Sequence, residues 1–96
     1  QPFCITLEKP FKPGIIDLWI KVLLLFQGPD LLRMKGIVNV ADQRGPTVIH
    51  AVQHIFHPLV MLETWPSLDH RTRIIFITRN LDEASIRRSL MDLLDE

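Results

Sequence analysis

The sequence has no net charge and no tyrosine, and it contains only one cysteine and four glycines. Its 11 lysines and arginines balance 11 aspartates and glutamates, so no overall field attracts a nucleic acid or an anionic membrane. The absence of tyrosine also removes one of the side chains on which unpaired bases stack. We therefore expect neither a nucleic acid nor a membrane as a partner.

The single cysteine, Cys4, excludes a disulfide within the chain. Secreted domains of this size often need disulfides, so one cysteine indicates a reducing, cytoplasmic compartment. Cys4 lies in a strand-like segment, and we expect its side chain to be buried. The N-terminus lacks the basic and apolar regions of a signal peptide. The longest apolar stretch, residues 15–26, is shorter than the ~20 residues that cross a bilayer.

The motifs of common enzyme sites are also missing. The four glycines are isolated from one another, so the sequence has no phosphate-binding loop of the GxxxxGK(S/T) or GxGxxG type. It has no GxSxG turn of the serine hydrolases, and no neighbour in sequence would activate the thiol of Cys4. We therefore predict that this chain is not an enzyme.

The pattern of apolar residues predicts one domain over residues 1–96. The predicted order is β-α-β-β-β-β-α, which indicates an α+β fold with a mainly antiparallel sheet of four to five strands and two helices packed on it. The last strand is an uninterrupted apolar run, which is typical of burial on both faces. The predicted strands cover residues 3–7, 32–41, 47–62 with a break near Pro58, and 73–78. The first predicted helix covers residues 15–26, with Pro13 suited to its first position. The second begins after Asp82, which we expect to be its N-cap.

The first predicted helix is apolar over about 260° of its circumference. Only Asp17 and Lys21 mark a face that water would wet, and they form an i, i+4 pair. One sheet cannot cover so wide an apolar arc. Another domain, another copy of the chain or the remainder of this domain would have to cover it.

Three histidines, His50, His54 and His57, follow one another at intervals of four and three residues. On a helix they would share a face and could hold zinc. On a strand, which the neighbouring β-branched residues favour, His50 and His54 are ~13 Å apart. A bend before Pro58 would still bring His57 round. We keep these three as candidate metal ligands, against the alternative of histidines on a sheet surface.

Arg33 and Lys35 would share one face of the second strand, ~7 Å apart. Such a pair could bind an anion or an acidic surface of a partner, or it could belong to an ordinary solvated strand. Gly36, directly after them, predicts a bulge or a close approach of another backbone.

Several short motifs together are similar to a known family. These motifs, in family order, are PFKP at 10–13, RMKG at 33–36, Trp65 in the loop before the last strand, RIIFI at 73–77 and Leu81-Asp82 at the entry to the last helix. With them the chain resembles, over residues 3–94, the C-terminal domain of CobW-like proteins, although Thr78 and the segment 52–54 replace family glycines.

The resemblance implies that the chain is part of a longer protein whose N-terminal P-loop GTPase domain is absent, in agreement with a first residue that is not methionine. Full-length CobW-like proteins are metallochaperones linked to zinc homeostasis or to cobalt delivery for cobalamin synthesis. GTP, magnesium and a metal, zinc or cobalt, would bind to the absent domain, and no cofactor is expected within residues 1–96.

The same resemblance implies a regulatory or client-recognition role for the C-terminal domain. Its expected partners are its own GTPase domain, a client metalloprotein and a further copy of itself. Arg33, Lys35, Gly36 and Trp65 are the candidate interaction residues. The alternative hypothesis is a direct metal carrier that uses His50, His54 and His57.

Overall fold

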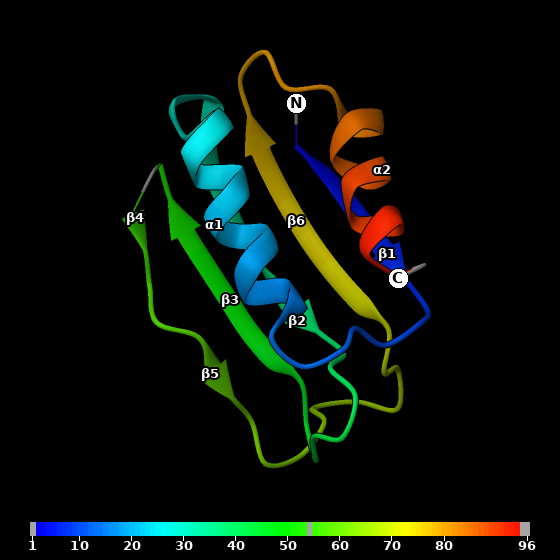
Figure 1. The fold of residues 1–96 in the computed structure, drawn as a ribbon. Coiled ribbons are helices and arrows are strands. Elements are labelled where there is room, and N and C mark those ends of the chain that lie inside the picture. The colour runs from blue at the N-terminus through cyan, green and yellow to red at the C-terminus, as the bar shows by residue number, and fades with distance from the viewer. Residues whose placement is uncertain (1, 54, 95–96) are drawn as a thin grey trace.

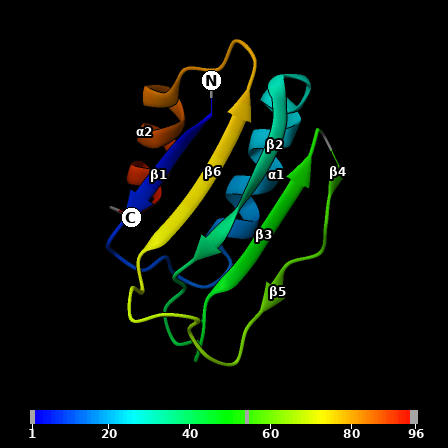
Figure 2. The same cartoon turned by 180° about the vertical axis from the view of Figure 1, so that it is seen from behind.

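The structure, a computed structural model, describes residues 2–53 and 55–94. All strand pairs in the sheet are antiparallel, in the order β1-β6-β2-β3, and the two short strands β4 and β5 pair with opposite ends of β3. Both long helices lie on one face of this sheet (Figures 1 and 2). The elements are β1 (Phe3–Leu7), α1 (Ile15–Gln27), the 3-10 helix η1 (Gly28–Asp30), β2 (Leu31–Val38), β3 (Thr47–Val52), β4 (Ile55–Phe56), β5 (Val60–Met61), β6 (Thr72–Thr78) and α2 (Glu83–Leu94).

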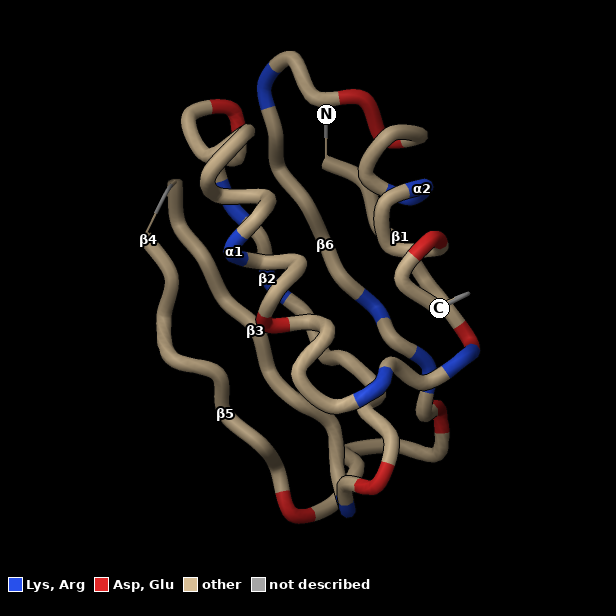
Figure 3. Tube along the Cα trace, in the orientation of Figure 1, with Lys and Arg blue, Asp and Glu red and all other residues tan. Residues whose placement is uncertain are grey.

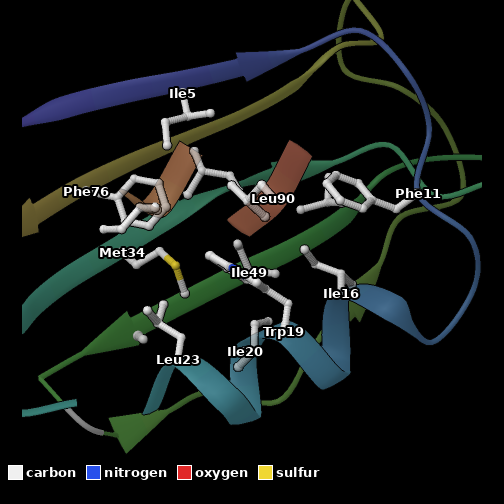
Figure 4. Close-up of a cluster of buried hydrophobic side chains, with 14 of the residues drawn as sticks. Ile5, Phe11, Ile16, Trp19, Ile20, Leu23, Met34, Ile49, Phe76 and Leu90 are labelled. Carbon is white, nitrogen blue, oxygen red and sulfur yellow. The ribbon is translucent and has the colours of Figure 1, made fainter. Parts of the chain in front are cut away.

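The predicted α+β fold is confirmed, with a sheet of six strands instead of four to five. The core is a single cluster between the sheet and the two helices (Figure 4). Phe76 of β6 is fully buried in it, and its ring stacks on Phe3 at 5.1 Å and meets Trp19 edge-on at 6.3 Å. Other buried members are Ile5, Leu7, Phe11, Ile16, Ile20, Leu23, Leu31, Met34, Val38, Val40, Ile49, Ala51, Ile74, Ile86 and Leu90.

The helix ends follow local chemistry. Asp82 caps α2, as predicted, because its carboxylate accepts hydrogen bonds from the Ala84 N–H and the Ser85 hydroxyl, both at 3.2 Å. The prediction for α1 was less accurate, since Pro13 is not its first residue. Gly14 precedes the helix with a φ of 86°, a left-handed conformation that glycine adopts without a steric penalty.

Two strand boundaries differ from the predictions. β2 begins at Leu31 and ends at Val38, and an irregularity of its pairing between Leu31 and Arg33 places Leu31 in the core instead of Leu32. The segment 47–62 forms strands, as predicted. It breaks first at Gln53, whose φ of 55° turns the chain, and again between β4 and β5 near Pro58.

The prediction that β6 is buried on both faces is wrong. β6 pairs with strands on both sides, yet Ile75 is 54% exposed because both helices pack on the other face of the sheet. Cys4, predicted to be buried, is exposed on this same uncovered side, with its Sγ 4.0 Å from the Thr6 hydroxyl. In the described part of the chain, no helix has the length and apolar character to cross a membrane.

Candidate interaction site on the open face of the sheet

The face of the sheet that α1 and α2 leave uncovered is the candidate functional surface, and we call it the open face (Figure 2). Its residues alternate with the core residues along the four longer strands, as the twofold period of a strand requires. Its members are Cys4 and Thr6 of β1, Arg73, Ile75 and Ile77 of β6, Arg33, Lys35 and Ile37 of β2, and Val48, His50 and Val52 of β3.

The strand register arranges these side chains in rows. Lys35 lies between Ile75 of β6 and His50 of β3. Arg33 lies between Ile77 and Val52 in the next row. The two cations of β2 therefore stand in a column with isoleucines on one side. Arg33, Lys35, Ile75 and Ile77 line a shallow hollow of about 230 Å³.

Charge on the open face has one sign. Its charged residues are Arg33, Lys35 and Arg73, and it carries no carboxylate among the described residues. Asp69 of the preceding loop lies 3.8 Å from the guanidinium of Arg73 and partly neutralises it. No described carboxylate lies within 4.0 Å of Arg33 or Lys35. Acidic residues lie instead in loops and on helices (Figure 3).

His50 and His57 meet at the β3 edge of this face. Their rings stack at 4.6 Å with planes 9° apart, and the His57 N–H donates a hydrogen bond to the His50 carbonyl at 3.0 Å. Nε2 of His50 is buried and has no hydrogen-bond partner within the described chain. Burial, and then the neighbouring His57, Arg33 and Lys35, lower the pKa of His50 from its usual 6.5. This favours the neutral form of His50 at pH 7.

The stacked rings bear on the predicted metal site. The bend before Pro58 does bring His57 to His50, but the lone pairs of two parallel rings lie in parallel planes and do not converge on one ion. His54, the third predicted ligand, lies outside the described residues. Within residues 2–53 and 55–94, no three histidine, cysteine, aspartate or glutamate side chains cluster as a metal site.

The comparisons with known proteins agree with this fold. Residues 1–94 match the family model of the "Cobalamin synthesis protein cobW C-terminal domain". The chain belongs to this family. Two crystal structures, the Zn(II)-bound YjiA GTPase from E. coli and a Zn(II)-bound triple mutant of YjiA, share the fold of this CobW C-terminal domain. For each, the TM-score is 0.86 and the identity 22%, over 97% of this chain and 29% of the YjiA chain. No curated protein matches the chain.

The predicted close backbone approach at Gly36 occurs inside this CobW domain. A Cβ at Gly36 would lie 2.2 Å from the carbonyl oxygen of Arg73 and 2.7 Å from the Cα of Ile74. Gly36 alternates with Lys35, so it belongs to the helix side of β2 and not to the open face. Its position accounts for the glycine in the RMKG motif as a requirement of β2–β6 packing.

Trp65 of the CobW domain lies away from Arg33 and Lys35. Its ring stacks on His70 at 4.3 Å, within the loop that joins β5 to β6. The Leu62 N–H bonds to the Pro46 carbonyl and so fixes this loop beside the start of β3, whereas Arg33 pairs with the last residue of β3, Val52. The structure thus brings Arg33 and Lys35 together with His50 and His57, but not with Trp65.

The place of Ile75 and Ile77 on an uncovered face could not be predicted, because an apolar run in the sequence looks the same whether a second layer covers it or not. The sequence did indicate a second surface, the outer face of α1. Leu18, Val22, Leu25 and Phe26 are exposed there, Leu25 by 77% and Phe26 by 75%, so the described domain does not wrap this helix. A cavity of about 160 Å³ between α1 and α2, lined in part by Val22 and Phe26, adjoins this face.

Proposed function

We propose that this CobW C-terminal domain is the non-catalytic client-recognition part of a P-loop GTPase metallochaperone that handles zinc or cobalt. The observation that carries the proposal is the open face, a sheet surface with the exposed Ile75 and the half-buried Ile77 beside two cations that have no carboxylate partner among the described residues. Contiguous exposed apolar surface on a folded domain marks an interaction site. The family match and the Zn(II)-bound GTPase of similar fold support the context of metal handling.

This assignment separates binding from chemistry. The sequence has no phosphate-binding loop, so GTP and magnesium would bind to a different part of the parent protein. Among the described residues, the two histidines that could meet a metal ion are stacked and not convergent. What the domain offers is a surface, and we propose that a client metalloprotein docks on it.

The outer face of α1 would serve a second contact. Leu25 and Phe26 are among its most exposed apolar side chains, and Asp17 and Lys21 form an i, i+4 pair at 2.9 Å on the same helix. The cation of this helix, Lys21, is paired with Asp17, so this surface offers apolar residues without unpaired cations such as Arg33 and Lys35 of the open face. We propose that it packs on the parent's own GTPase domain or on a second copy of the chain.

Site-specific photo-cross-linking tests the division between these two surfaces. A photoreactive phenylalanine analogue is placed in the full-length parent protein at Ile75, at Leu25 or, as a control on α2, at Met91, which are all exposed. We expect Ile75 to capture a separate metal-binding protein and Leu25 to capture the GTPase domain or a second copy. Capture of the same protein from all three positions, or of the GTPase domain alone from Ile75, would contradict the proposal.

The absence of catalysis is tested on the purified chain. Incubation with GTP and magnesium is expected to release no phosphate above the rate of the buffer. Steady phosphate release that follows this chain through two different purification steps would show that the domain has a catalytic site and would overturn the assignment.

A further inference from the structure

We infer that the open face recognises an acidic segment of a partner protein that also carries an apolar anchor side chain. This inference rests on the proposed recognition role and names the chemistry of the partner. It follows from three features of the open face, namely the sign of its charge, the spacing of its cations and the kind of apolar residues beside them.

The positive charge of the open face is a local feature, because the chain as a whole is neutral, with 11 basic and 11 acidic residues. On the open face, Arg33, Lys35 and Arg73 meet no carboxylate from the described part of the sheet, and only Arg73 has one nearby from a loop. Fixed cations without partners attract an anionic ligand and repel a basic one. The unpaired cations are therefore complementary to carboxylates of the partner.

The spacing of the two unpaired cations fits a polypeptide. Arg33 and Lys35 are two residues apart on β2 and so ~7 Å apart along the strand, which is also the distance between alternate side chains of an extended segment. The guanidinium can hold one carboxylate through two parallel hydrogen bonds, and the ammonium can meet the next. Two acidic residues at alternate positions of the segment would satisfy both cations.

The hollow supplies the apolar part of the contact. Ile75 and Ile77 form its apolar side, and Ile75 is 54% exposed, so an apolar side chain seated there would remove hydrocarbon of both molecules from water. An inorganic anion would leave these isoleucines exposed. An acidic segment with one apolar residue near its carboxylates uses all four residues of the hollow.

A nucleic acid fits this surface less well. Sheets that bind single strands present aromatic rings on which bases stack. The described residues of the open face include no phenylalanine or tryptophan, because Phe3 and Phe76 point to the helix side, and the ring of His50 is already stacked on His57. The isoleucines in the hollow cannot replace a stacking platform, so we favour a protein partner.

Cys4 provides a reporter at the site. It is the only cysteine of the chain, it is exposed, and it lies opposite Ile75 in the β1–β6 ladder. A ligand that covers Ile75 should therefore slow the alkylation of Cys4 by iodoacetamide. The probe is a short synthetic peptide with glutamates at alternate positions and one leucine. Its matched peptides carry glutamine for glutamate or serine for leucine.

Two charge-reversed double variants test the cations. Arg33→Glu with Lys35→Glu removes the proposed contacts. Lys9→Glu with Arg88→Glu changes the net charge by the same amount at exposed positions outside the open face. We expect the first variant to need at least about tenfold more peptide for the same protection of Cys4, and the second to bind like the parent chain. Protection should weaken with added salt, because exposed charges are screened.

Each of the remaining outcomes counts against the inference. Equal protection by the glutamine peptide would remove the acidic requirement, and equal protection by the serine peptide would remove the anchor. Stronger protection by single-stranded DNA of the same charge would favour a nucleic acid. No protection by the glutamate–leucine peptide up to about 1 mM would also overturn the inference. The cross-link from Ile75 tests the proposed function separately. If it captures a client whose contact segment is basic or neutral, the proposed function holds and the inference of an acidic segment fails.

Discussion

Lys35 and His50 lie directly opposite each other across the β2–β3 ladder, on the face of the sheet that neither helix covers. Burial of the His50 ring, and then the neighbouring His57, Arg33 and Lys35, lower the pKa of His50 and favour its neutral form. At pH 7 the charge of the open face therefore comes from its arginines and lysine. Protonation of His50 would add a positive charge beside Arg33 and Lys35, which repel it.

The first prediction concerns acid. The pKa of His50 is lower in the folded chain than its usual 6.5, so the unfolded chain binds the proton more readily. The contribution of His50 to stability is complete above pH 6.5 and is lost as the pH falls through 6.5 towards the folded pKa. Urea unfolding between about pH 7.5 and pH 5 should show a falling midpoint. Burial of the His50 ring is the main cause of this change, and the stacked His57, Arg33 and Lys35 add to it.

The His50→Phe variant isolates this contribution, because it keeps an aromatic ring against His57 and removes the titrating group. Its urea midpoint should depend less on pH than that of the parent chain over the same range. If the two pH profiles run parallel, the acid sensitivity comes from other groups and the prediction fails.

The second prediction concerns Gly36. Alanine there would place its Cβ 2.2 Å from the carbonyl oxygen of Arg73, which is backbone and has little freedom to move. We expect Gly36→Ala to lower the free energy of unfolding by about 3 kcal/mol, at the upper end of the cost of overpacking. Gly14→Ala is the matched control, since that site is spacious and the cost of its positive φ is about 1 kcal/mol.

Urea unfolding of the two alanine variants compares these costs directly. A Gly36→Ala chain as stable as Gly14→Ala would mean that β2 and β6 can separate locally without loss. The glycine of the RMKG motif would then need a different explanation, such as contact with a partner.

The third prediction concerns the start of α2. Asp82→Ala removes the hydrogen bonds to the Ala84 N–H and the Ser85 hydroxyl and should cost about 1 kcal/mol of stability. Asp92→Ala removes the same charge near the other end of the helix, where a carboxylate opposes the helix dipole. Thermal unfolding should show a lower midpoint for the first variant and an unchanged or higher one for the second. Equal losses in both variants would point to net charge instead of capping.

The prediction from sequence succeeded where the signal is local. The first strand, predicted over residues 3–7, and the start of the last helix at Asp82 are both confirmed, because both depend on neighbours in the chain. The exposure of Cys4 and Ile75 depends on which face of the sheet the helices cover, and a local pattern does not contain this information.

The candidate site shows the same limit. Arg33 and Lys35 were predicted to share a strand face, and they do, because that follows from the twofold period of β2. Their isoleucine neighbours come from β6, which is distant in sequence, and were not predicted. Gly36 is required because the Arg73 carbonyl of β6 leaves no room for a side chain. The RMKG motif could therefore be recognised in the sequence, but the need for its glycine could not be explained without the structure.

The last prediction concerns zinc and cobalt. The rings of His50 and His57 are 4.6 Å apart and nearly parallel, so a shared ion would require the stack to open, and Nε2 of His50 is buried. Opening the stack costs binding energy, and Arg33 and Lys35 repel a divalent cation. Calorimetric titration of the chain with zinc or cobalt should therefore show no site with a Kd of about 1 μM or tighter. Tight binding that His50→Ala and His57→Ala each abolish, and that is lost near pH 5.5, would instead establish these histidines as ligands and favour the metal-carrier hypothesis.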